Sequence, residues 1–138
     1  RIDKYVDEDK YILIDYKNST GGVRNLSNII DGVSLQLPLY ILSQNDKNVV
    51  AAMYGVLSTG EFKVALGSSE ETHLISKRNS GALSSEKMKE LIGIVKEHIK
   101  SYIDSILSGD FSINPKECSD YCIYKDICRY KDSLEVLI

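Results

Sequence analysis

The chain has 138 residues, of which 43% are hydrophobic and 27% are charged, and its formal net charge is −3 at pH 7. This length fits one domain or part of one, and the apolar content is too high for an intrinsically disordered chain. The negative net charge argues against a protein that coats nucleic acid by neutralising its phosphates, but it allows an enzyme that meets DNA through divalent cations and a small basic surface.

The sequence contains no targeting or membrane-spanning signal. No apolar run approaches the roughly 18 residues that cross a bilayer, and the chain opens with Arg1-Ile2-Asp3-Lys4, in which charged and apolar residues alternate. We therefore expect a cytoplasmic protein that does not bind membranes. Because the chain starts without Met and inside a predicted strand, we expect it to be a fragment of a longer protein.

Two strands are predicted at the start of the chain, over residues 1–7 and 11–17, because both segments are rich in Ile, Val, Tyr and Leu. We predict that Asp7 pairs with Tyr11 across a three-residue loop, since this register sorts apolar and polar side chains onto different faces. The apolar face then carries Ile2, Val6, Ile12 and Ile14. The opposite face carries Asp3, Tyr5, Leu13, Asp15 and Lys17.

The middle of the chain predicts one helix and two further strands. Residues 18–32 are rich in Ser, Asn and Gly and are predicted as a long loop with one short helical turn. A helix is predicted over residues 34–44, with Pro38 near its first turn, where a missing N–H costs little. Residues 49–57 form a nearly continuous apolar run, which is typical of a strand buried on both faces, and residues 61–66 are predicted to return as an edge strand.

Residues 67–83 lack a clear pattern and are predicted as loop, whereas residues 85–108 form the strongest predicted helix. Apolar residues recur there at spacings of three and four, Ser84 can cap the start, and Gly109 can end the helix. Strand, strand, helix and buried strand, in this order, predict an α/β fold. The first helix then crosses over the sheet, so that the buried strand runs parallel to the second strand.

Asp15 and Lys17 end the second strand and lie two residues apart, so their side chains project to the same face. In the predicted register, Asp3 projects beside them. Two adjacent carboxylates repel unless a cation lies between them, and Mg²⁺ or Mn²⁺ prefers such oxygen ligands. Together with a neighbouring lysine, this is the chemistry of phosphodiester hydrolysis. The alternative is a solvated face with a cross-strand ion pair, which is the commoner meaning of an isolated Asp-x-Lys triplet.

Gln36 and Tyr40 lie four residues apart on the predicted crossover helix and share one face of it. One interpretation is a polar pair that reaches toward the strand ends. The other is a partly buried tyrosine with a satisfied hydroxyl, and this second interpretation is favoured when the pair is considered alone.

Three cysteines, Cys118, Cys122 and Cys128, lie within one short segment near the end of the chain. An odd, clustered set without a secretion signal favours metal or cluster ligands over disulfides. Structural zinc and iron–sulfur sites usually need four ligands, and neither His73 nor His98 is near in sequence. The alternative is a set of free buried thiols.

Taken together, Arg1-Ile2-Asp3, Ile14-Asp15-Tyr16-Lys17 and the segment from Leu35 to Tyr40 resemble the motif order of the RecB-type branch of the PD-(D/E)XK nuclease superfamily. The tail from Cys118 to Arg129 resembles the end of an iron–sulfur staple in several such nucleases. These include the AddB subunit of AddAB-type helicase–nucleases, whose C-terminal nuclease domain is the closest resemblance, and RecB-like nucleases associated with CRISPR systems.

The resemblance implies a restriction-endonuclease-like α/β core, with a central mixed β-sheet flanked by helices and truncated at its N-terminus. It implies that residues 1–110 form a partial nuclease core and that residues 111–138 form a cysteine-containing tail. In this family pattern Asp3 and Asp15 would bind Mg²⁺ or Mn²⁺, and Lys17 would be the catalytic lysine. The polar pair Gln36 and Tyr40 would support the site or contact DNA.

The resemblance further implies that Cys118, Cys122 and Cys128 hold three corners of a [4Fe–4S] cluster. The fourth ligand of the family lies upstream of the nuclease motifs, so we expect the cluster in the full-length protein and not in this fragment. Cys118 and Cys122 are separated by three residues, where the family usually has two.

We therefore expect a Mg²⁺- or Mn²⁺-dependent deoxyribonuclease, acting as an exonuclease in a helicase–nuclease complex of double-strand-break repair. Its partners would be DNA and a helicase–nuclease subunit. The alternatives are a non-catalytic DNA-binding or scaffold module of the same fold, a CRISPR-associated RecB-like nuclease, and a small zinc-binding interaction domain. The intact Asp3, Asp15 and Lys17 favour the enzyme, and the zinc domain would leave the strand motifs unexplained.

Overall fold

The computed structural model of this chain describes residues 1–71, 73, 75, 81–112, 122–124 and 127. The chain divides into two compact units, Arg1–Ile99 and Lys100–Ile138. The predicted division into a core of residues 1–110 and a tail of residues 111–138 stays a prediction. Within the described residues, no helix is long and apolar enough to cross a membrane.

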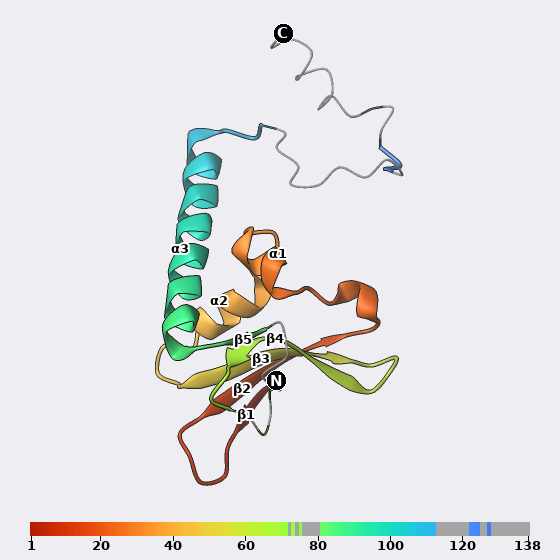
Figure 1. Ribbon diagram of the computed structural model, residues 1–138. Coiled ribbons are helices and arrows are strands. Elements are labelled where there is room, and N and C mark those ends of the chain that lie inside the picture. Colours follow the sequence, from red (N-terminus) through yellow and green to blue (C-terminus); the bar gives the residue numbers. More distant parts are fainter. Residues whose placement is uncertain (72, 74, 76–80, 113–121, 125–126, 128–138) are drawn as a thin grey trace. The chain divides into compact units, whose positions relative to one another are not determined.

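The first unit contains a five-stranded mixed sheet with the strand order β1-β2-β3-β4-β5 (Figure 1). The strands are β1 (Ile2–Lys4), β2 (Tyr11–Lys17), β3 (Val49–Val56), β4 (Glu61–Ser68) and β5 (Ala82–Leu83). Strands β2 and β3 are parallel, as are β4 and β5, whereas β1 is antiparallel to β2 and β4 is antiparallel to β3. The predicted α/β fold with a mixed central sheet is confirmed.

The connection between the parallel strands β2 and β3 holds three short helices: η1 (Thr20–Gly22), α1 (Leu26–Ile30) and α2 (Gln36–Leu42). The segment predicted as a loop with one helical turn therefore contains both η1 and α1. Helix α1 begins with a capping box, in which the side chains of Asn25 and Asn28 each accept a hydrogen bond from the other residue's backbone N–H. The Ser/Asn-rich composition that favours loops also favours such caps.

The long helix α3 (Ser85–Ser108) has the predicted bounds. At its start, Oγ of Ser84 accepts a hydrogen bond from the Lys87 N–H at 3.3 Å. At its end, Gly109 has a φ of 73°, in the left-handed region where glycine is favoured. Both predicted helix signals are confirmed.

The helices cover one face of the sheet, and Figure 1 shows α1, α2 and the start of α3 on that side. The larger core lies between these layers. It includes Leu13, Ala52 and Tyr54 from the sheet, Ile29 and Leu37 from the short helices, and Leu91 and Val95 from α3. A smaller core on the opposite face includes Ile14, Ala51, Met53 and Ile75. Strand β3 is therefore buried on both faces, as its apolar run predicts.

The predicted edge strand over residues 61–66 is confirmed, because only the two following residues of β4, Gly67 and Ser68, pair with β5 in the described part of the chain. Strand β4 as a whole pairs with β3 on one side and with the two-residue strand β5 on the other. Strand β5 lies in the segment predicted as loop, because two residues are too few to show an alternating pattern.

The predicted register between the first two strands is also wrong. Asp3 lies opposite Ile12 and Lys4 opposite Tyr11, so the observed pairing differs from the prediction by three residues. Because this shift is an odd number, it moves Asp3 to the face opposite Asp15. The prediction that these two carboxylates converge is therefore wrong.

The physical reason for the error is the width of the hairpin loop. The N–H of Tyr5 donates to the carbonyl of Lys10 at 3.0 Å, and the residues between them are left outside the strands. Val6, assigned by the prediction to the apolar face, is 96% exposed. Strand β1 has only three paired residues and lies at the edge of the sheet, where the apolar pattern specifies register weakly.

Candidate active site

Asp15 and Lys17 lie at the C-terminal end of β2. They alternate with Tyr16 and share the face of Leu13, so their side chains project to the face that the helices cover. Nζ of Lys17 lies 2.8 Å from Oδ2 of Asp15, and the two side chains are 25% and 16% exposed. This Oδ2 atom is buried and accepts no hydrogen bond within the described residues, so its contact with Lys17 is an ion pair without hydrogen-bond geometry. A buried carboxylate oxygen in this state favours a further cation or donor.

Helix α2 supplies the next contacts. The Lys17 ammonium donates to Oε1 of Gln36 at 2.7 Å, and Nε2 of Gln36 donates to the Tyr40 hydroxyl at 3.0 Å. Gln36 is the first residue of α2, and the neighbouring Leu37 is fully buried against the sheet. The buried leucine therefore anchors the helix end that holds the amide over Lys17.

We call the connected set of Asp15, Lys17, Gln36 and Tyr40 the polar chain. The structure brings these four predicted residues together at one end of the sheet. The tyrosine is 44% exposed and its hydroxyl accepts from Gln36, so the structure is compatible both with the polar pair and with a partly buried tyrosine whose hydroxyl is satisfied. The catalytic and supporting roles predicted for the polar chain stay predictions.

Asp3 does not join the polar chain. On the other face of the sheet, its Oδ1 accepts from Nε of Arg1 at 2.7 Å. Nη1 of the same guanidinium donates to the Tyr16 hydroxyl at 3.2 Å, and the carboxylate and the hydroxyl together hold the pKa of Arg1 above its usual range. Asp3 is thus tied to Arg1 and Tyr16 and not to Asp15.

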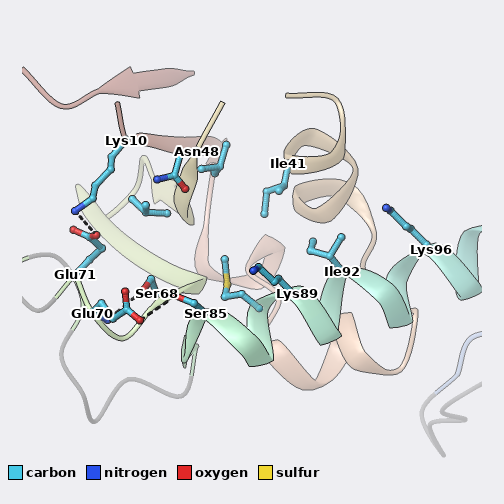
Figure 2. Close-up of a pocket in the computed structure, with 13 residues that line it drawn as sticks. Lys10, Ile41, Asn48, Ser68, Glu70, Glu71, Ser85, Lys89, Ile92 and Lys96 are labelled. Atoms are coloured by element: carbon cyan, nitrogen blue, oxygen red, sulfur yellow. Dashed lines mark hydrogen bonds and ion pairs between the residues drawn. The ribbon is translucent and has the colours of Figure 1, made fainter. Parts of the chain in front are cut away.

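Described residues line two cavities near the sheet. The smaller, of about 240 Å³, adjoins Tyr40 and is also lined by Ile2, Leu13 and Gln44. The larger, of about 710 Å³, lies by the starts of β2 and β3, the end of β4 and the first turns of α3. Figure 2 shows Lys10 reaching Glu71 at one end of this larger cavity, with an Nζ to Oε1 distance of 2.8 Å, and Lys96 at the other end.

The larger cavity is separate from the polar chain. Asn48 and Val49 line it, and Val49 pairs with Tyr11 at the start of β2. Six residue steps of about 3.3 Å separate Tyr11 from Lys17 along this strand, so about 20 Å lies between the two sites.

The family model of the PD-(D/E)XK nuclease superfamily matches residues 1–129. The chain belongs to the PD-(D/E)XK nuclease superfamily. No curated protein and no solved structure matches it. The family predicted from the order of the motifs is confirmed, and the five-stranded mixed sheet with its flanking helices is the restriction-endonuclease-like α/β fold that the resemblance implies.

Members of this superfamily typically use divalent metal ions, and the donor set of the polar chain allows one. The described residues contain no group of three or more His, Cys, Asp or Glu side chains that could hold a metal. Mg²⁺ does not require such a group, since it keeps several waters and binds through one or two carboxylates plus substrate phosphates. The buried Oδ2 of Asp15, which accepts no hydrogen bond in the described part of the chain, fits this kind of ligand.

Two residues that contact Lys17, Tyr54 and Gly22, and one residue close to Gly22 in sequence, Arg24, were not predicted as candidates. Tyr54 of β3 pairs with Asp15 of β2, and the centroid of its ring lies 5.6 Å from Nζ of Lys17. A Cβ on Gly22 would lie 3.1 Å from Cδ of Lys17, so η1 packs against the lysine stem. Arg24 follows η1 and donates to the carbonyls of Gly21 and Val23. The parallel pairing of β2 with β3 would have indicated Tyr54, whereas nothing in the loop sequence indicates the other two.

The cysteine prediction falls mostly outside the described residues. Cys118 and Cys128 are not among them, and Cys122 is a free thiol within the described part of the chain. The ligand set of the [4Fe–4S] cluster therefore stays a prediction.

Proposed function

We propose that this domain is a divalent-cation-dependent deoxyribonuclease with Asp15 and Lys17 at its catalytic centre. The observation that carries the proposal is the buried Oδ2 of Asp15, which accepts no hydrogen bond in the described residues and lies 2.8 Å from Nζ of Lys17. A carboxylate and an ammonium held together at a strand end suit the attack of water on a phosphodiester.

In this proposal Asp15 would hold Mg²⁺ or Mn²⁺. Such a cation, when bound, stabilises negative charge on the phosphate and makes water a better nucleophile. Lys17 orients the attacking water and stabilises the charge that develops on the phosphate oxygens. Gln36 keeps the ammonium in place through its 2.7 Å hydrogen bond and is a positioning residue.

The bond changes in the hydrolysis balance with one water molecule. A water oxygen forms a new bond to phosphorus, and the bond from phosphorus to one ester oxygen breaks. One proton of the water ends on the departing oxygen, so the products are a phosphomonoester and a free hydroxyl end.

Arg24 is proposed as a contact to the DNA backbone. It lies two residues after Gly22, which packs against the stem of Lys17. It forms no ion pair with a carboxylate in the described part of the chain, and its side chain is exposed. A guanidinium in this position can bind a phosphate next to the scissile one.

The biological setting is proposed from the resemblance. The order of the three motifs and the clustered cysteines support an exonuclease of a helicase–nuclease complex in double-strand-break repair, similar to the nuclease domain of AddB. The partners are then DNA and a helicase–nuclease subunit. In the full-length protein, Cys118, Cys122 and Cys128 would join a further ligand around a [4Fe–4S] cluster.

The proposal is tested by the degradation of linear DNA by the full-length protein in Mg²⁺ or Mn²⁺. We expect wild-type protein to degrade DNA, chelation to stop the reaction, D15A to abolish it, and K17A to leave only a small residual rate. The D15A variant should keep its circular dichroism spectrum, because the site it alters is a functional ion pair and not the core. Cleavage by D15A at the wild-type rate would refute the catalytic assignment, and inactive wild-type protein would support the scaffold alternative.

A further inference from the structure

The aromatic ring of Tyr54 faces the ammonium of the proposed catalytic lysine. Tyr54 pairs with Asp15 of the parallel strand β2, so its side chain shares a face of the sheet with Asp15 and Lys17. The ring centroid lies 5.6 Å from Nζ of Lys17, within the roughly 6 Å over which a ring face attracts a cation. Asp15 and Gln36 contact the same ammonium at 2.8 Å and 2.7 Å. The lysine is therefore contacted from β2, α2 and β3.

The ring lies in a part of the protein from which water is excluded. Tyr54 is 1% exposed and belongs to the larger core together with Leu13 and Ala52. A ring face attracts an ammonium more strongly at a desolvated site than at an exposed one. The Lys17 side chain keeps 25% of its surface exposed, so the lysine borders the core on one side and is open to a substrate on another.

Core packing alone does not require an aromatic residue at this position. Tyr54 is the only aromatic residue of β3, whose other residues are Val, Ala, Met and Gly. An aliphatic side chain also fills a core, but it presents no negative surface, whereas the face of an aromatic ring is negative. The aromatic residue of this strand stands beside Lys17, where such a surface has a cation to attract.

We propose that Tyr54 is a positioning residue, whose ring face holds the ammonium of Lys17 in the place from which it acts on the phosphodiester. An ammonium stabilises a transition state best when it is already fixed where the negative charge develops. The ring is neutral, so it fixes Lys17 without cancelling its positive charge, as a second carboxylate would. This inference rests on the proposed function, since that function gives Lys17 its role.

A series of rings at position 54 separates the attraction from the packing. Fluorine atoms on phenylalanine withdraw electrons and weaken the negative ring face, while the shape of the ring changes little. We would compare Y54F with its difluoro and pentafluoro analogues in full-length protein, and measure kcat and KM for degradation of linear DNA in Mg²⁺ or Mn²⁺. We expect kcat to fall stepwise, by about 2- to 30-fold at the pentafluoro ring, with KM nearly constant.

Met53 supplies the matched control for a loss of packing. It precedes Tyr54 in β3, is 7% exposed and belongs to the smaller core on the opposite face of the sheet. Y54L and M53A both remove buried atoms and should lower the thermal stability, but only Y54L should lower kcat, and Y54F should restore it. Wild-type kcat in Y54L, an equal loss of kcat in M53A, or the same kcat across the fluorinated series would overturn the inference.

Chemical labelling of Lys17 distinguishes this inference from the proposed function. The rate at which an amine-reactive ester acylates Lys17, followed by peptide mass spectrometry in EDTA and without DNA, reports how firmly the ammonium is held. We expect the pentafluoro variant to be labelled about 2- to 30-fold faster than Y54F, and M53A to be labelled like wild type. Faster labelling in a protein that does not cleave DNA would support the ring contact and refute the nuclease. Cleavage by wild type, with constant kcat and labelling across the series, would refute the positioning role and leave the nuclease standing.

Discussion

Replacement of Gln36 by leucine tests whether helix α2 positions the catalytic lysine. The side chain of Gln36 accepts from Nζ of Lys17 at 2.7 Å and donates to the Tyr40 hydroxyl at 3.0 Å. Leucine has a similar size and can make neither bond. A hydrogen bond to a charged group contributes about 1.5–3 kcal/mol. If that contribution is realised in the transition state, its loss lowers kcat by about 10- to 150-fold.

The assay is the steady-state rate of linear DNA degradation at saturating Mg²⁺ or Mn²⁺, with kcat and KM determined separately. We expect Q36L to lower kcat, and Y40F, which removes only the acceptor of Nε2, to lower it by about 2- to 10-fold. Q44L is the matched control. Gln44 follows the same helix, and its side-chain amide donates to the exposed Ser43 hydroxyl at 3.1 Å.

A double variant decides whether Gln36 acts through Lys17. If it does, K17M combined with Q36L should be no less active than K17M alone, because the partner of the amide is already absent. Wild-type kcat in Q36L, or an additive loss in the double variant, would refute the positioning role.

Three further predictions concern stability and the cysteine tail. L37A should lower the free energy of unfolding by about 2–5 kcal/mol in chemical denaturation, because Leu37 is fully buried between α2 and the sheet, and a loss below 0.5 kcal/mol would contradict this packing. G81A should cost about 1–3 kcal/mol, since its Cβ would lie 2.6 Å from the backbone oxygen of Ala65, whereas G93A, with open space around its Cβ, should gain up to about 1 kcal/mol. Full-length protein purified without oxygen should contain iron that C122S loses, and iron-free wild-type protein with normal thermal stability would defeat the cluster.

The sequence predicts most of the fold because its strongest patterns are long. The 24-residue helix α3 and the apolar strand β3 each carry many residues that repeat one signal, so their positions follow directly. The parallel pairing of β2 and β3 follows from the helices that connect them. Strand β5 has two residues and carries no such signal.

The site was predictable where it depends on spacing along one element, and not where it depends on pairing between elements. Asp15 and Lys17 share a face because they are two residues apart on one strand, and Gln36 and Tyr40 because they are four apart on one helix. The position of Asp3 depends on the register of an edge strand that has only three paired residues. The apolar pattern of Ile2 and Val6 indicated the wrong register there.

The most direct test of the catalytic centre is Mn²⁺ binding to full-length protein without DNA, compared between wild type, D15N and D3N by electron paramagnetic resonance. Asp15 presents a buried oxygen without a hydrogen bond in the described residues, whereas Asp3 is paired with Arg1 on the other face. We expect D15N to lose one Mn²⁺ site and D3N to bind Mn²⁺ like wild type. Loss of the same site in D3N, or full Mn²⁺ binding by D15N, would contradict a centre built on Asp15 and Lys17 alone.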